Sequence, residues 1–284
     1  MEEGTPKTRS QVHEIEIDAP IEAVWKAITD AEELTRWFVD HAKVTPGVGG
    51  TCWVAWGEDE SQQGYIKKIE VWEPPRRLRL GPQAPEESDT GPSTEAQAAL
   101  AVPIVDEYTL ETRGGRTLLR FVSSGIPTSA EWDGFYDGTN SGWKLFFRTL
   151  RHYLEQHPGE PRNPLITLQH PIAIDTAEAW KKFIGPEGLA AEGTLEGLKD
   201  GDRFQVKTSA GESLTGEVAI IKPPRSVLLT IDTFNGAVLS AAFEQMGGAN
   251  FLYISLSTYG SPGERTSALR ERWTRWLKEL FQLQ

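Results

Sequence analysis

Apolar residues recur at helical spacing in two stretches of this chain. Within residues 143–153 they stand at positions i, i+3, i+4, i+7 and i+10, which places them on one broad stripe of a helix with charged residues opposite. Residues 273–283 repeat this stripe at a constant offset of 130 positions. Each stretch predicts a long amphipathic helix, and their match in register predicts an internal repeat.

Two earlier segments recur in the same order. A short amphipathic helix is predicted at residues 20–28 and again at 176–184, where a shared Trp-Lys pair lies 155 positions apart. A strand, a Pro-Pro turn and a second strand follow, with Pro74-Pro75 in the first copy and Pro223-Pro224 in the second. The second copy is shorter mainly between this turn and its last helix. There the first copy carries residues 84–102, rich in Pro, Glu, Ser, Thr and Ala, which predict a mobile loop.

Alternating apolar and polar positions between these segments predict strands. The expected strands are 12–18, 50–56, 64–72, 77–81, 104–112 and 116–123 in the first copy, and 165–174, 202–208, 213–221, 226–234, 237–245 and 251–258 in the second. Each copy then consists of a strand, one or two short helices, a meander of about five strands and one long helix. This order predicts an α+β fold in which the long helix covers the concave face of a curved antiparallel sheet.

The length of 284 residues fits two such domains. We place the first domain at residues 1–156 and the second, a shorter and diverged copy, at residues 165–284. Residues 157–164 contain the sequence His-Pro-Gly-Glu-Pro, which breaks a helix, and they are predicted to link the two domains.

Composition narrows the range of partners. Asp and Glu outnumber Lys and Arg by 41 to 29, and the resulting net charge of −12 opposes binding to nucleic-acid backbones and anionic lipids. No run of about 18 apolar residues occurs, so we expect no membrane span. The single cysteine, Cys52, cannot form an internal disulfide, and residues 1–10 lack the apolar stretch of a secretory signal. Together these features predict a cytoplasmic protein.

Five motifs of the first copy occur together. They are Ala19-Pro20 with Val24-Trp25, Leu34-Thr35-Arg36-Trp37-Phe38, Pro46-Gly47 with Gly49-Gly50, Pro74-Pro75-Arg76-Arg77-Leu78, and Gly142-Trp143 with Leu150 and Tyr153-Leu154-Glu155. In this combination they resemble the family of homologues of the heat-shock-protein-90 ATPase activator, within the START-like superfamily of polyketide cyclase and lipid-transport proteins. The resemblance implies a helix-grip fold, in which a seven-stranded antiparallel sheet wraps around a long C-terminal helix and leaves an apolar tunnel between them. The second copy shares the resemblance only through the repeat.

A tunnel of this kind would be lined by the N-terminal half of the long helix and by the concave face of the sheet. The candidate ligand-cavity residues are Trp132, Phe135, Tyr136, Asn140 and Trp143 on the helix, with Trp37 and Phe38 at the mouth. Aromatic-lined pockets with few polar groups suit small apolar or aromatic molecules. The alternative is that these aromatic side chains fill the core. The second copy has Leu189-Ala190-Ala191-Glu192-Gly193 at the mouth position, so the first domain is the expected binding domain.

Three functions remain open at this point. The first is a non-catalytic tandem protein that binds a small hydrophobic ligand in its first domain, without a cofactor. The second is a chaperone-associated or stress-response module that binds a protein partner, although the chaperone-binding domain of the eukaryotic members of the family is not recognisable here. The third is a cyclase-like or dehydratase-like enzyme, which would need Asp133 or Asp137 in the tunnel as a general acid or base.

Alternatively, Asp133 and Asp137 cap the start of the long helix and complement its dipole. The five histidines show no metal-ligand spacing, and no phosphate-binding loop, dinucleotide fingerprint or nucleophile elbow is present. We therefore assign no catalytic residue and no metal ligand.

Overall fold

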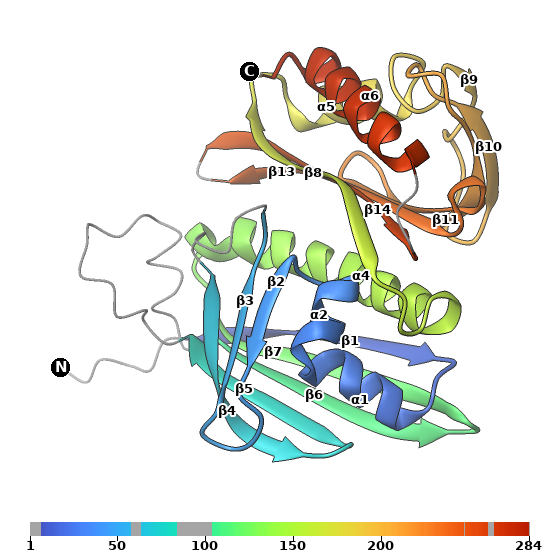
Figure 1. Cartoon of the computed structure of the whole chain (residues 1–284). Coiled ribbons are helices and arrows are strands. Elements are labelled where there is room, and N and C mark those ends of the chain that lie inside the picture. The colour runs from blue at the N-terminus through green and yellow to red at the C-terminus, as the bar shows by residue number, and fades with distance from the viewer. Residues whose placement is uncertain (1–6, 58–63, 84–103, 247, 261–263, 284) are drawn as a thin grey trace. The chain divides into compact units, whose positions relative to one another are not determined.

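The computed structural model describes residues 7–57, 64–83, 104–246, 248–260 and 264–283 (Figure 1). The chain divides into two compact units, Met1–Gly159 and Glu160–Gln284, named unit 1 and unit 2 below. The mobile loop predicted at residues 84–102 lies outside the described residues. Strand β8 begins at Arg162, so residues 162–164, assigned above to the linker, are part of the first strand of unit 2.

Unit 1 is a single antiparallel sheet with helices on one face (Figure 1). Its elements are β1 (Thr8–Ile17), α1 (Ile21–Thr29), α2 (Ala31–Trp37), β2 (His41–Val44), β3 (Thr51–Ala55), β4 (Tyr65–Glu73), β5 (Arg77–Gln83), β6 (Val105–Arg113), β7 (Arg116–Pro127), the 3-10 turn η1 (Ala130–Trp132) and α4 (Asp133–Gln156). The strands lie in the order β1-β7-β6-β5-β4-β3-β2. From β2 to β7 each strand pairs with the next one along the chain, which makes a meander. The exception is β1, which pairs with β7.

Unit 2 repeats this topology. Its elements are β8 (Arg162–Ile172), α5 (Thr176–Ile184), β9 (Glu192–Gly193), β10 (Arg203–Lys207), β11 (Ser213–Lys222), β12 (Ser226–Ile231), the 3-10 turn η2 (Asp232–Phe234), β13 (Ala237–Met246), β14 (Ala249–Tyr259) and α6 (Glu264–Phe281). The strand order β8-β14-β13-β12-β11-β10-β9 matches that of unit 1 strand for strand. The predicted fold class is confirmed: both units are α+β helix-grip domains with a long C-terminal helix against a seven-stranded sheet.

One detail differs from the sequence expectation. The short edge strands β2 and β9 were not predicted, because four and two residues are too few to show an alternating pattern. Of the one or two short helices expected in each copy, unit 1 has two, α1 and α2, and the described part of unit 2 has one, α5. In unit 2 the chain folds back tightly behind α5, where a side chain at Gly188 would lie 2.0 Å from the Phe183 carbonyl oxygen. Only glycine fits at this close approach. The chain forms turns here, where unit 1 has α2.

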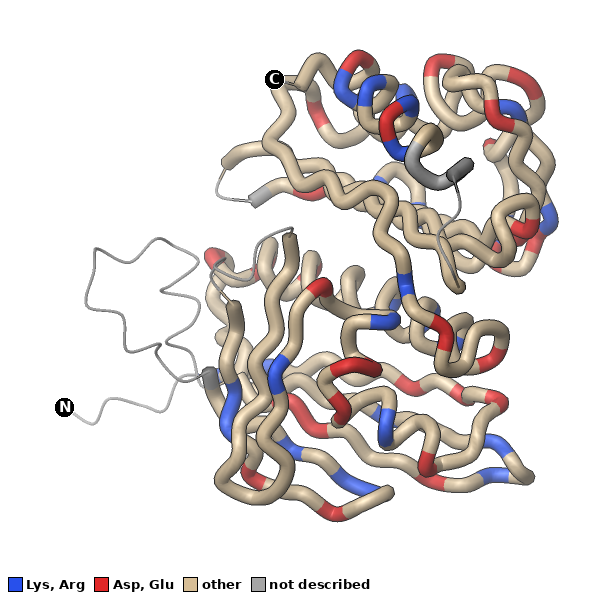
Figure 2. The backbone as a smooth tube through the Cα atoms, in the orientation of Figure 1, with Lys and Arg blue, Asp and Glu red and all other residues tan. Residues whose placement is uncertain are grey.

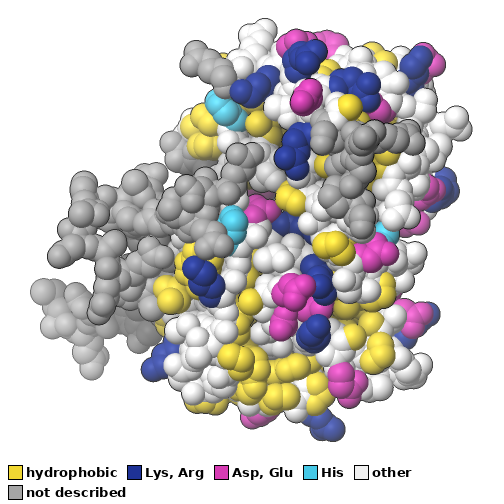
Figure 3. Space-filling model, viewed as in Figure 1, with side chains coloured by type: hydrophobic (Ala, Val, Ile, Leu, Met, Phe, Trp, Pro, Cys, Tyr) yellow, Lys and Arg dark blue, Asp and Glu magenta, His cyan; other side chains and the backbone are white. Residues whose placement is uncertain are grey.

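Opposite charges cover the outer face of the unit 1 sheet, as the alternation of side chains in a strand predicts. Four ion pairs join neighbouring strands there: Glu16–Arg116 at 3.0 Å, Glu14–Arg120 at 3.3 Å, Arg77–Glu107 at 2.8 Å and Glu70–Arg79 at 2.9 Å. Figure 2 shows segments of both signs distributed over the strands, and Figure 3 shows basic and acidic side chains interspersed on the visible surface. The inner face carries the apolar residues that pack against α4.

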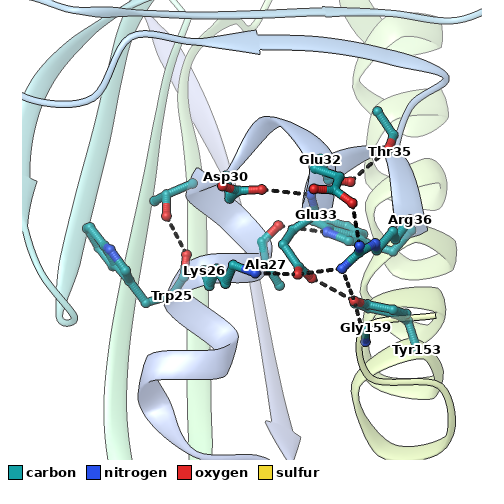
Figure 4. A network of polar contacts seen from close by, with 12 residues as sticks. Trp25, Lys26, Ala27, Asp30, Glu32, Glu33, Thr35, Arg36, Tyr153 and Gly159 are labelled. Atoms are coloured by element: carbon teal, nitrogen blue, oxygen red, sulfur yellow. Dashed lines mark hydrogen bonds and ion pairs between the residues drawn. The ribbon is translucent and has the colours of Figure 1, made fainter. Parts of the chain in front are cut away.

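A buried carboxylate joins the helices of unit 1 (Figure 4). Glu33 in α2 is 6% exposed, and its Oε1 accepts hydrogen bonds from Lys26 at 2.9 Å and from Arg36 at 2.7 Å. Its Oε2 accepts a 2.6 Å bond from the Tyr153 hydroxyl, which in turn accepts the N–H of Gly159 at 2.9 Å. Burial, followed by the bond to Glu33, raises the pKa of Tyr153, which keeps the hydroxyl a donor. The network therefore connects α1 and α2 to the end of α4.

Replacing Tyr153 with Phe is expected to destabilise unit 1 by about 1–3 kcal/mol, because it leaves one buried oxygen of Glu33 without a donor. Denaturant unfolding followed by circular dichroism measures the change. The matched control is Tyr65→Phe, since Tyr65 is 44% exposed, and it is expected to alter the free energy of unfolding by less than about 0.5 kcal/mol. Equal effects of the two substitutions would contradict the role assigned to the network.

Candidate ligand-binding site

Four aromatic side chains from three parts of unit 1 meet beside the N-terminal half of α4. Phe38, directly after α2, stacks on Trp143 of α4 with ring centroids 5.5 Å apart. The edge of Phe38 also meets Trp56, which follows β3, at 5.3 Å, and Phe146 at 4.8 Å. The indole N–H of Trp56 donates to the Phe38 carbonyl oxygen at 3.1 Å. All four side chains are half-buried, so this aromatic cluster is packed but not closed over.

The cluster continues inward to the sheet. Trp143 lies 4.2 Å from Phe121 on β7 and 5.4 Å from Phe147, centroid to centroid. Phe121 and Phe147 are buried, whereas Trp143 is partly exposed. Trp143 therefore extends from the surface to the core along one face of α4. Apolar stripes on the helix and the alternation of β7 place these rings together.

Trp37 has a different place from the one expected. It is 2% exposed, and its indole N–H donates to the Ala27 carbonyl oxygen at 2.9 Å. This bond holds α2 onto α1, while the outer side of the ring stacks on Phe38 at 5.1 Å. Trp37 thus supports Phe38 from within the core, and Phe38 is the residue of this pair that reaches the half-exposed cluster.

The remaining helix candidates lie nearer the start of α4. Trp132 and Phe135 form an edge-to-face pair at 5.4 Å, and Asn140 is half-buried on the next turn. Tyr136 is committed to contacts with β1: its hydroxyl donates to the Ser10 carbonyl oxygen at 3.2 Å, and the Arg9 guanidinium lies 4.2 Å from its ring centroid. Tyr136 consequently anchors the helix start to the sheet.

Neither acidic residue considered for catalysis lies in the interior. The side chain of Asp133 is 59% exposed and forms an ion pair with Arg9 at 2.7 Å, and Asp137 is also exposed. The hypothesis of a general acid or base at these two positions is therefore wrong. Asp133 does stand in the first turn of α4, where a negative charge complements the helix dipole, but its side chain makes no capping hydrogen bond.

A separate set of buried polar groups lies on the sheet. Lys67 of β4 and Asp106 of β6 form an ion pair at 2.5 Å, with side chains only 17% and 11% exposed. Lys67 also donates to the Ile104 carbonyl oxygen at 3.1 Å. Asp106 Oδ2 accepts a hydrogen bond from the Lys67 ammonium, but the buried Oδ1 of Asp106 has no hydrogen-bond partner. Burial and the nearby carboxylate of Asp106 raise the pKa of Tyr108 well above its usual value.

Gln11 and His13 on β1 extend this polar part of the interior. Gln11 is 2% exposed, and its amide donates to the Tyr136 carbonyl oxygen and to the Thr139 hydroxyl, both at 2.7 Å, while its Oε1 is buried without a partner. His13 lies against the rings of Phe121 and Phe147, with its Nε2 also buried and unpaired. The sequence did contain a signal for these residues, since polar side chains stand at inward positions of alternating strands.

Cys52 lies near the same group of residues. Burial raises the pKa of its thiol to about 11, with a smaller opposing effect from Lys67. The thiol is therefore protonated at neutral pH and is a poor nucleophile. Among the residues that the structure describes, no group of three or more His, Cys, Asp or Glu side chains is placed to hold a metal ion.

Residues 18–155 match the model of one protein family, described as Activator of Hsp90 ATPase homolog 1-like protein. The matched residues all lie within unit 1. No curated protein matches the chain. None of the described helices is both long enough and apolar enough to cross a bilayer.

Several solved structures share the fold at low identity. The solution structure of the Aha1 dimer from Colwellia psychrerythraea is 22% identical, covers 53% of this chain and 99% of that one, and has a TM-score of 0.41. The crystal structure of DynU16, from the dynemicin biosynthetic locus, is 17% identical over 96% of this chain and 97% of that one, with a TM-score of 0.40. The di-domain ARO/CYC BexL from the BE-7585A biosynthetic pathway is 12% identical over 97% of both chains, with a TM-score of 0.40. Likenesses of this strength say nothing about what the chain binds.

His13 makes the stability of unit 1 depend on pH. Burial, assisted by the charge of Lys144, lowers its pKa from 6.5 to about 4. Between these values the unfolded chain binds a proton that the folded unit does not, so acidification through this window lowers the free energy of unfolding, by up to about 3 kcal/mol.

Replacing His13 with Leu is expected to remove this part of the pH dependence, because leucine has no proton to gain. Denaturant unfolding at pH 7, 5.5 and 4 measures it. His41→Gln is the control, since His41 is only half-buried, and the control protein is expected to keep the acid sensitivity. A His13→Leu protein with the wild-type pH profile would contradict the assignment.

Proposed function

We propose that unit 1 is a non-catalytic binding domain that holds a small hydrophobic ligand between the inner face of its sheet and α4. The half-buried aromatic cluster of Phe38, Trp56, Trp143 and Phe146 carries this proposal. Large rings from separate elements meet there at stacking distance while remaining partly accessible to solvent. Such rings offer broad contact area to an aromatic or apolar guest.

Unit 2 supplies the contrast within the same chain. Trp273 of α6 is the counterpart of Trp143, yet it is fully buried. Its indole N–H donates to Glu212 Oε2 at 2.9 Å, and Glu212 also pairs with Arg272. The loop before β11 is thus fastened over the helix by polar contacts, and the core beneath it is packed with Phe183 and Phe243. Unit 2 fits a filled, structural copy.

Access in unit 1 would follow from side-chain rotation. Phe38 is held by ring packing and lies at the C-terminal end of α2, while the Trp56 indole of the cluster donates a hydrogen bond to a backbone oxygen. Rotating Phe38 and Trp56 exposes the face of Trp143 without breaking a strand or helix hydrogen bond. Half-buried side chains exchange rotamers far faster than backbone elements move.

A neutral hydrophobic fluorophore, N-phenyl-1-naphthylamine, tests the proposal. Saturable binding is expected, measured by the fluorescence of the probe and by energy transfer from tryptophan. Phe38→Ala and Trp143→Ala are each expected to weaken binding about tenfold or more, because a lost aromatic contact of about 1.4 kcal/mol corresponds to that factor.

Trp72→Ala is the matched control, since Trp72 is also half-buried and pairs with Trp25 at 5.2 Å, outside the aromatic cluster. It is expected to leave the Kd within about twofold of wild type. Circular dichroism and the unfolding midpoint show whether each variant folds. Absence of saturable binding, or equal losses in all three variants, would overturn the proposal.

The match of residues 18–155 to the family model supports a second candidate, an interaction with a chaperone. The family is described by the activation of an ATPase, and the proteins of that description act on Hsp90. If unit 1 acts in this way, adding the purified protein to Hsp90 raises the steady-state ATPase rate, and the rise saturates with concentration. An unchanged rate, with no comigration of the two proteins in sedimentation, would rule this candidate out.

A further inference from the structure

Five polar residues lie across the inner face of the unit 1 sheet: Gln11, Cys52, Lys67, Asp106 and Ser123, named the polar row below. Gln11 of β1 stands opposite Ser123 of β7, and Ser123 stands opposite Asp106 of β6. On the other side Cys52 of β3 stands opposite Lys67 of β4. The Lys67–Asp106 ion pair connects the two sides across β5. Residues opposite one another in a ladder point to the same face, so the members on each side of β5 share one face, and the ion pair joins the two sides past Leu80 of β5.

Unit 2 has an apolar residue or glycine at every counterpart of this row. We identify the counterparts from the strand order and pairing that the two units share. Leu80 and Leu229 hold equivalent positions; Leu80 stands opposite Asp106 and Leu229 stands opposite Leu239, so Asp106 corresponds to Leu239. In chain order, Gln11, Cys52, Lys67, Asp106 and Ser123 correspond to Ile166, Phe204, Gly216, Leu239 and Leu256. All five unit 2 residues are buried. The fold therefore forms without polar groups at these positions.

The polar row is costly to bury. An ion pair removed from water loses hydration that its own attraction only partly restores, and a buried oxygen without a donor also destabilises the folded state. Asp106 Oδ1 and Gln11 Oε1 are two such oxygens. Because unit 2 has apolar residues or glycine at the same positions, the packing of this fold does not require the polar row. A bound polar group that donates to these oxygens would offset the cost.

The contacts that remain open define the chemistry of that group. Asp106 Oδ1 can accept a hydrogen bond. The Lys67 ammonium has three N–H donors and uses two, on Asp106 and on the Ile104 carbonyl oxygen. A hydroxyl group can donate to the first and accept from the second, whereas a ketone cannot donate and an ammonium cannot accept. The ion pair is already neutral in sum, so a charged ligand gains no countercharge here.

We propose that the polar row binds the hydroxyl group of a neutral, hydroxylated aromatic ligand, with Asp106 accepting the hydroxyl hydrogen and Lys67 donating to the hydroxyl oxygen. The aromatic body of the ligand lies against Tyr108 and Phe121, which flank the row on β6 and β7 with ring centroids 4.8 Å apart. This inference rests on the proposed binding function of unit 1 and adds the class of ligand to it.

Two probes of matched shape test the inference, 2-naphthol and 2-methylnaphthalene, titrated into the whole protein at pH 7 with tryptophan fluorescence as the readout. Wild type is expected to bind 2-naphthol at least about tenfold more tightly, since hydrogen bonds to charged groups contribute on that scale. The double variant Lys67→Met with Asp106→Leu, which imitates the apolar row of unit 2, is expected to bind both probes with similar Kd.

The matched control is Glu14→Leu with Arg120→Met, which removes an ion pair on the outer face of the same sheet. It is expected to keep the tenfold preference. Should the first double variant fail to fold, Asp106→Asn keeps the shape of the side chain and is expected to reduce the preference by weakening the acceptor.

The outcomes separate the two proposals. Equal affinity of wild type for both probes, or a preference that survives either Asp106 variant, would overturn the hydroxyl assignment and leave hydrophobic binding intact. Binding of neither probe would overturn both.

Discussion

The structure of each unit depends on one packing arrangement, the apolar stripe of a long helix against the inner face of a seven-stranded sheet. In unit 1 this contact buries Phe147, Leu150 and Tyr153, and in unit 2 it buries Trp273 and Leu277. A helix of 24 or 18 residues has little stability on its own, and most of it comes from such burial. Every other feature, including the aromatic cluster and the polar row, is positioned by where this helix crosses the sheet.

The periodicity of the sequence was sufficient for the fold because both patterns are long. The stripe from Trp143 to Tyr153 and the alternation along the strands each extend over several repeats, and the Pro-Pro turns mark the same point in both copies. The site was less predictable. Phe38 and Trp143 were identified as site residues, but Trp56 was not, because the pattern placed it only as the last residue of the strand predicted at 50–56, whereas β3 ends at Ala55. The burial of Trp37 depends on a hydrogen bond to Ala27, ten residues away, which spacing does not reveal.

The two units show how one scaffold accommodates different interiors. The helix, the strand order and the turn chemistry are shared, while the inner side chains range from Lys67 and Asp106 in unit 1 to Gly216 and Leu239 in unit 2. In unit 2 the interior is continuous apolar packing, with the buried carboxylate of Glu212 bound at its edge by Trp273 and Arg272. Since the fold forms with both interiors, the fold itself does not require the polar side chains of unit 1.

The ion pairs on the outer face of the unit 1 sheet also depend on the register of its strands. Glu14 faces Arg120 only when β1 and β7 are paired as observed, with Gln11 opposite Ser123. A slip of one residue would turn every side chain of β1 to the other face, placing Gln11 and His13 in solvent and the glutamates in the core. The register that brings the outer charges together is therefore also the register that places the polar side chains of β1 on the inner face.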